Sequence, residues 1–143
     1  MFKHILVPTD LSGQENHALD IAVKLCTMDG GNISLLHVIE VIANTTFEEF
    51  SDFYKKLEEN AHAGLNRMMD GMMDGVKDAD IDILPEVIYG NRAQEILRFV
   101  EERGIDLIVM KSHRIDVEDR AQGWGTISYK VGILAPCPVM LVK

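Results

Sequence analysis

Residues 106–143 read DLIVMKSHRIDVEDRAQGWGTISYKVGILAPCPVMLVK, and this stretch decides the fold. The run at 107–110 is continuously apolar, which is typical of a strand that a parallel sheet buries on both faces. A polar, cation-rich segment follows it, and Gly125-Thr126 then begins a helix. Val139–Val142 is apolar again and predicts a last strand. Because backbone N–H groups at a helix N-terminus are unpaired, a loop between a buried strand and such a helix start is suited to hold an anion.

Strand-like and helix-like segments also alternate through the rest of the chain, which is the pattern of a parallel α/β sheet. Short apolar runs predict strands at 5–7, 33–38 and 83–89. Apolar residues spaced by three and four positions predict helices at 18–25, 47–76 and 93–100. Asn91 is the expected N-cap of the last of these helices and Gly104 its end. Five strands and four helices result, within a single domain that spans residues 1–143.

The helix predicted over 47–76 is unusually long for a connection between two strands. Either threonine of the pair at 45–46 is its expected N-cap. The glutamates at 48–49 would then lie in its first turn, where the helix dipole favours acids. We expect this helix to fray or bend towards Gly71, because glycine lowers the helix propensity of the chain.

Composition limits the class of protein. The chain has 143 residues, of which 47% are hydrophobic and 26% charged, as expected of a globular domain with its own core. No apolar run approaches the roughly 20 residues of a membrane span and no signal-peptide core is present, so we expect a cytoplasmic protein without a membrane partner. The formal net charge of −9 argues against a nucleic-acid partner, which would need a basic face. Cys26 and Cys137 form no redox motif and are expected to be buried free thiols.

Five segments, taken in order, resemble the single-domain, UspA-like members of the universal stress protein family: ILVPTDLS at 5–12, LLHVIE at 35–40, VIYGNRAQEIL at 87–97, DLIVMKSH at 106–113 and GTISYKVGILAPCPVMLVK at 125–143. The resemblance implies an α/β, Rossmann-like fold of the adenine nucleotide alpha hydrolase-like type. In that fold a single open five-stranded parallel sheet, in the strand order 3-2-1-4-5, carries helices on both faces. This order places the switch point between the first and fourth strands. Asp10 and the segment that starts at Lys111 should therefore face each other across one crevice.

The resemblance implies that this crevice receives an adenine nucleotide, with ATP and magnesium as the candidate cofactors. The candidate cofactor-binding residues lie at the ends of three strands and at the start of the last helix: Pro8, Thr9, Asp10, Val38, Met110, Lys111, Arg114, Gly125, Thr126 and Ile127. Asp10 is the implied nucleoside contact, because a carboxylate accepts hydrogen bonds from a ribose hydroxyl or an adenine amine. The alternative is structural, with Asp10 capping the next helix or closing an Asx turn. Thr126 likewise is either a phosphate contact or only the cap of the last helix.

The sequence departs from the family at the phosphate loop. In nucleotide-binding members the fourth strand runs into a glycine, two residues, a second glycine, nine residues and then Gly-Ser or Gly-Thr. Here Lys111 and Arg114 occupy the two early glycine positions, and ten residues separate Arg114 from Gly125. Glycine lets a backbone approach phosphate closely, whereas lysine and arginine add bulk although both bind phosphate through their charge. Two interpretations stay open: an altered phosphate site, or one in which Lys111 occupies the phosphate position and pairs with Asp10.

The leading interpretation is a non-enzymatic, stress-response or regulatory homodimer whose degenerate nucleotide pocket binds ATP weakly or not at all. The alternatives are a genuine ATP- or AMP-binding universal stress protein and, as the weakest, a small nucleotide hydrolase, for which no phosphoryl-transfer motif is present. We expect the homodimer to form through the last strand, Val139–Val142, because an apolar strand at a sheet edge needs cover. An unidentified protein partner is a further expectation. The five histidines lack metal-ligand spacing, so no metal site is predicted.

Overall fold

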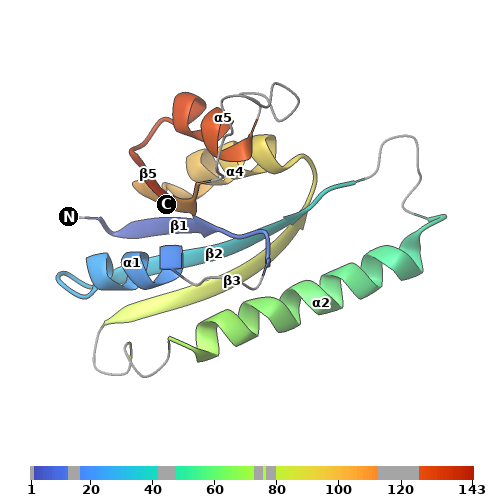
Figure 1. The fold of residues 1–143 in the computed structure, drawn as a ribbon, viewed down its shortest axis with the longest axis horizontal. Coiled ribbons are helices and arrows are strands. Elements are labelled where there is room, and N and C mark those ends of the chain that lie inside the picture. The colour runs from blue at the N-terminus through green and yellow to red at the C-terminus, as the bar shows by residue number, and fades with distance from the viewer. Residues whose placement is uncertain (1, 13–16, 42–47, 73–75, 77–79, 113–125) are drawn as a thin grey trace.

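The structure, a computed structural model, describes residues 2–12, 17–41, 48–72, 76, 80–112 and 126–143 (Figure 1). Strands and helices alternate along it, as predicted, in the order β1 (His4–Pro8), α1 (His17–Cys26), β2 (Gly31–Ile39), α2 (Ser51–Asp70), β3 (Ile81–Tyr89), α4 (Arg92–Arg103), β4 (Leu107–Lys111), α5 (Ile127–Leu134) and β5 (Val139–Val142). Each strand predicted from the sequence is present, and its bounds differ from the predicted ones by at most two residues.

The strands form one parallel five-stranded sheet in the order β3-β2-β1-β4-β5, which confirms the predicted fold class. The strand order switches between β1 and β4, and the ladder there is short. Its last pair is Leu6 with Ile108, whereas β1 stays paired with β2 as far as Pro8. The carboxyl ends of β1 and β4 are therefore not joined, and this is where open sheets of this kind receive ligands.

Two hydrophobic clusters bury the two faces of the sheet. Helices α1 and α2 cover one face, and α4 and α5 cover the other (Figure 1). On β1, Ile5 and Val7 belong to the first cluster and Leu6, between them, belongs to the second. β4 alternates in the same way and is buried from Leu107 to Met110. The continuous apolar run of this strand is thus explained by its burial on both faces.

Helix α2 begins later than the sequence predicts. Its N-cap is Phe50, which makes no side-chain capping hydrogen bond, so the glutamates at 48–49 precede the helix and were wrongly placed in its first turn. The threonine pair at 45–46 lies outside the described residues. In the first turn of the helix, Tyr54 is fully buried and packs edge-to-face against Tyr89 of β3. The helix ends at Asp70 with Gly71 as its C-cap, close to the predicted weak point. None of the described helices has both the length and the apolar character needed to cross a membrane.

Helix α4 begins and ends as the sequence predicts. The Asn91 side chain accepts a 3.1 Å hydrogen bond from the backbone N–H of Gln94, which satisfies one of the unpaired donors of the first turn. Gly104 ends the helix in the left-handed conformation, with a φ of 63°, and donates its N–H to the Val100 carbonyl. The N-cap Asn91 sets the start of α4 just after the carboxyl end of β3. The opening between β1 and β4 lies at the same end of the parallel sheet.

The two cysteines differ in burial and form no disulfide. Cys26 is buried, as predicted, whereas Cys137 is only half-buried, so the prediction of full burial was wrong for it. Cys137 lies in the short connection between α5 and β5 and packs at the margin of the second hydrophobic cluster. Burial raises the pKa of both thiols above its ordinary value. The reactive thiolate is therefore scarce at neutral pH in either residue.

Candidate functional site

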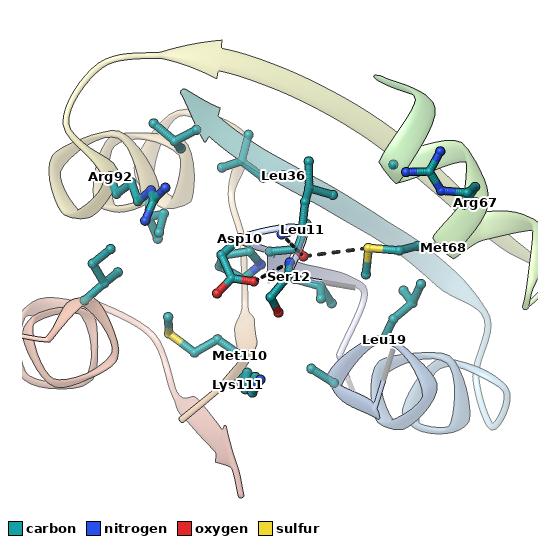
Figure 2. Close-up of a pocket in the computed structure, with 18 residues that line it drawn as sticks. Asp10, Leu11, Ser12, Leu19, Leu36, Arg67, Met68, Arg92, Met110 and Lys111 are labelled. Carbon is teal, nitrogen blue, oxygen red and sulfur yellow. Dashed lines mark hydrogen bonds between the residues drawn. The ribbon is translucent and has the colours of Figure 1, made fainter. Parts of the chain in front are cut away.

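A cavity of about 310 Å³ lies at the carboxyl ends of β1, β2 and β4, where the β1–β4 ladder has ended (Figure 2). Its volume lies at the lower end of the range of small-molecule sites. Seven of the residues predicted from the sequence line it: Pro8, Thr9, Asp10, Val38, Met110, Lys111 and Ile127. Thr126 directly precedes Ile127 as the N-cap of α5. Arg114 and Gly125 lie outside the described residues.

The walls of the cavity come from both faces of the sheet, because the cavity extends over the end of β1. On the side of α4 and α5 the wall is mainly apolar and includes Leu36, Val38, Ile96, Met110 and Ile127, together with the cationic Arg92 of α4. On the side of α1 and α2 it consists of Ala18, Leu19, Gly64, Arg67 and Met68. Most of this surface is hydrocarbon, so it suits a flat or apolar part of a ligand, with a few polar groups left to orient it.

The loop after β1 carries the only acidic residue among the described residues that line the cavity, Asp10. One oxygen of its carboxylate accepts a 2.9 Å hydrogen bond from the backbone N–H of Ser12. This Asx turn confirms the structural interpretation of Asp10. Figure 2 shows that the same side chain extends from the end of β1 into the middle of the cavity. A contact with a ligand is therefore compatible with its role in the turn.

Two further contacts hold this loop against β2. The backbone N–H of Thr9 donates to the Leu36 carbonyl at 2.9 Å, which continues the ladder beyond β1. His37 of β2 places its Nδ1 2.8 Å from the Thr9 carbonyl oxygen. His37 is half-buried, and its hydrogen bond to Thr9 stabilises the loop after β1. It does not line the cavity.

Three cationic side chains line the cavity: Arg67 of α2, Arg92 of α4 and Lys111 of β4 (Figure 2). Among the described residues none of the three has a carboxylate partner. The other two described arginines are paired, Arg98 with Glu95 at 2.6 Å and Arg103 with Glu86 at 2.9 Å. In a chain with a net charge of −9, the described residues thus place three cations and one carboxylate, Asp10, at one cavity.

Lys111 does not pair with Asp10 in the part of the chain that the structure describes. Its side chain is exposed at the end of β4 and lies on the rim of the cavity. The described residues thus give no support to the interpretation in which Lys111 neutralises Asp10.

Thr126 caps α5, as one of its two interpretations requires. Its Oγ1 accepts a hydrogen bond from the backbone N–H of Tyr129 at 3.4 Å and lies 3.4 Å from the Ser128 hydroxyl. The long distance to Tyr129 is at the upper limit of a hydrogen bond, so the cap is weak. A phosphate contact of the Thr126 hydroxyl stays a prediction.

Comparison with known proteins agrees with this architecture. The sequence profile described as the Universal stress protein family matches residues 1–143. This chain belongs to the universal stress protein family.

Individual relatives support the assignment of this universal stress protein along its whole length. Universal stress protein YxiE of Bacillus subtilis is 32% identical to it over 154 aligned positions that cover 100% of both chains. Among solved structures, universal stress protein UspA of Lactobacillus plantarum has a TM-score of 0.77 and 24% identity, covering 99% of this chain and 98% of its own. A universal stress protein family protein of Arabidopsis thaliana, solved with AMP bound, has a TM-score of 0.63 and 19% identity, covering 99% of this chain and 91% of its own.

The lining residues of this universal stress protein that the sequence analysis did not name include two cations, Arg67 and Arg92. Arg92 had a usable signal, because it follows the N-cap Asn91 at the carboxyl end of β3, the side of the sheet on which the crevice was expected. Arg67 had none. It lies in the last turn of a long amphipathic helix, and only the packing of α2 against the sheet brings it to the cavity.

Proposed function

We propose that this universal stress protein is a non-enzymatic, cytoplasmic regulatory homodimer that binds an adenine nucleoside monophosphate in the crevice and binds ATP only weakly. The observation that carries the proposal is the polar lining of the cavity. One carboxylate, Asp10, lies among three cations that have no carboxylate partner among the described residues. This arrangement suits a ligand that combines a hydroxyl-bearing or amine-bearing part with an anionic group.

The nucleoside part of the ligand is matched by Asp10 and the apolar wall. A carboxylate accepts hydrogen bonds from ribose hydroxyls or from the adenine amine, and Val38 and Met110 offer hydrocarbon to the base. The AMP-bound relative from Arabidopsis thaliana supports a monophosphate as the class of ligand. The anionic group would be balanced by Arg92, Arg67 or Lys111, none of which has a carboxylate partner among the described residues.

The weak binding of ATP follows from the residues at the two early glycine positions. Lys111 stands at the first of them, at the end of β4, and Arg114 stands at the second. Without glycine the loop backbone cannot approach a phosphate chain closely, so additional phosphates would gain few N–H contacts. Each charge-assisted bond from a side chain contributes about 1.5–3 kcal/mol, but a long flexible side chain loses conformational freedom when it binds. We therefore expect affinity not to increase with the number of phosphates.

The proposal that the protein does not hydrolyse its nucleotide is supported by the side chains that line the described part of the cavity. Asp10 is the single carboxylate among the described lining residues, and no histidine is among them. Asp10 already accepts a hydrogen bond from Ser12, which lowers its value as a general base. A hydrolase would need a general base and a residue that orients water for in-line attack on the phosphate. Neither is found among these described residues.

The homodimer is proposed through β5. It is an edge strand, and Met140 and Leu141 are each 37% exposed on it. On α5, Ile133 and Leu134 add exposed apolar surface next to the same edge, at 62% and 63%. The opposite edge strand, β3, contains Pro85, a residue that natural proteins use to discourage pairing at sheet edges. A two-fold axis at β5, perpendicular to the strand, would pair the strand antiparallel with its own copy and cover both surfaces.

Calorimetric titration with adenosine, AMP and ATP, each with and without magnesium, tests the ligand class. We expect AMP to bind more tightly than adenosine and ATP to show a Kd weaker than about 100 µM, which corresponds to about −5.5 kcal/mol. Phosphate release from ATP is measured on the same pure protein. Sustained release would show an enzyme and overturn the proposal, and so would ATP binding in the low micromolar range that exceeds the affinity for AMP.

A further inference from the structure

Leu11, the residue after Asp10, has an unusual backbone conformation. Its φ is 59°, which makes it the one non-glycine residue with a positive φ in the described part of the chain. A branched aliphatic side chain gains nothing by itself from this left-handed conformation, because it has no polar group to bond its own backbone. Within the loop only the Leu11 backbone is held, by a 3.1 Å hydrogen bond from its N–H to the Thr9 hydroxyl, so the hydrocarbon side chain depends on packing from outside the loop.

The Leu11 side chain packs against helix α2 at Gly64. Gly64 is buried in the middle of the helix, and a Cβ atom at this position would lie 3.1 Å from Leu11 Cδ2 and 3.5 Å from Leu11 Cδ1. The first distance is tighter than ordinary van der Waals contact. Only glycine thus leaves the leucine side chain its full room against the helix backbone.

A second contact from α2 reaches the residue on the other side of Asp10. The hydroxyl of Thr9 donates to the Met68 sulfur at 3.7 Å and accepts from the backbone N–H of Leu11 at 3.1 Å. Met68 lies one turn after Gly64 on the same face of α2. Figure 2 shows Met68 of α2 reaching towards the loop that carries Asp10 and Leu11. Helix α2 therefore contacts both neighbours of Asp10.

We infer that Gly64 and Leu11 are positioning residues for Asp10: the packing of Leu11 against Gly64 holds the loop after β1, and this sets the affinity of the crevice for its ligand. The inference rests on the proposed function, in which Asp10 contacts the nucleoside. The Leu11 side chain, packed on Gly64, fixes the left-handed turn, and the turn fixes the Asp10 carboxylate against the Ser12 N–H. A methyl group at position 64 requires the end of the Leu11 side chain to give by a few tenths of an ångström, and we expect the turn and the Asp10 carboxylate to shift with it.

The variant Gly64→Ala tests the inference, with Gly132→Ala as its matched control. Gly132 also lies within a helix, α5, but a Cβ there would meet nothing within 4 Å. AMP is titrated into each folded protein at a temperature well below its unfolding transition. We expect Gly64→Ala to weaken AMP binding about tenfold, the scale of one lost charge-assisted hydrogen bond, and Gly132→Ala to bind as the wild type does.

A readout without ligand separates this inference from the proposed function. The Ser12 amide, which donates to Asp10, is followed by hydrogen exchange in the ligand-free proteins. Faster exchange in Gly64→Ala, but not in Gly132→Ala, supports the inference whether or not AMP binds. Failure of the wild type to bind AMP would refute the proposed function alone. Unchanged exchange at Ser12 in Gly64→Ala, or unchanged AMP affinity where the wild type binds AMP, would overturn the inference.

Discussion

The hydroxyl of Tyr89 donates a 2.6 Å hydrogen bond to the carboxylate of Glu58, which joins the edge strand β3 to helix α2. The Tyr89 ring also packs edge-to-face against the buried Tyr54, with ring centroids 6.0 Å apart. This pair lies at the carboxyl end of the outermost strand on that side of the sheet. It fixes the helix whose Gly64 and Met68 contact the loop of the crevice.

The Tyr89–Glu58 pair predicts a loss of stability at alkaline pH. Burial, followed by the hydrogen bond to Glu58 and its negative charge, raises the pKa of Tyr89 to about 12 from an ordinary value of 10.0. Between these values the unfolded chain loses the tyrosine proton while the folded protein keeps it. The stabilisation is therefore complete below pH about 10 and is lost as the pH rises through about 12. Urea unfolding between pH 8 and about 11 should show a steeper decline for the wild type than for Tyr89→Phe. At neutral pH Tyr89→Phe should cost about 1 kcal/mol.

The control for this prediction is Tyr129→Phe, which removes a tyrosine outside the pair. It should keep the decline of the wild type with pH. An identical decline in Tyr89→Phe and the wild type would mean that the pair does not control alkaline stability.

The charge of Arg92 should be required for AMP binding. Arg92 is half-buried, lines the cavity and has no carboxylate partner among the described residues. Arg92→Gln keeps much of the side-chain volume and removes the charge, so AMP affinity should fall about tenfold or more while adenosine affinity changes little. Arg98→Gln, on the same helix, removes an arginine that pairs with Glu95 away from the cavity. Equal AMP affinities for these two variants in calorimetry would show that Arg92 does not contact the phosphate.

The bulk of the Lys111 and Arg114 side chains, at the two early glycine positions, should weaken ATP binding. The double variant Lys111→Gly with Arg114→Gly restores close backbone approach and should bind ATP more tightly than the wild type. The double variant Lys111→Gln with Arg114→Gln removes the charge but keeps the side chains, so it should not gain affinity. Calorimetric titration with ATP and magnesium measures both. If the wild type binds ATP at low micromolar concentration and the glycine variant loses it, the two cations are phosphate ligands and the interpretation is wrong.

Met140→Lys should convert the homodimer to monomer or to insoluble protein. The substitution puts a charge on the exposed edge strand β5, where the proposed two-fold axis would bring it close to its own copy. Leu84→Lys is the control, because Leu84 is similarly exposed, at 46%, on the opposite edge strand β3. Light scattering should report a monomer for the first variant and a dimer for the second. A soluble, unaltered dimer of Met140→Lys would exclude this placement of the interface.

The sequence by itself determined the elements and their caps, because these depend on residues close together along the chain. The apolar run at 107–110 predicts a strand buried on both faces, and Asn91 and Gly104 predict both ends of α4. The start of α2 could not be predicted in this way. Phe50 offers no capping group, so no residue at this helix start marks it in the local sequence.

The family resemblance supplied the strand order and with it the side of the sheet where the crevice lies. Only the tertiary structure decided what surrounds Asp10. The early end of the β1–β4 ladder, the arrival of Arg67 at the cavity and the fit of Leu11 against Gly64 all join residues far apart in the chain. Such contacts depend on how helices pack on the sheet, and no local pattern of apolar residues encodes them.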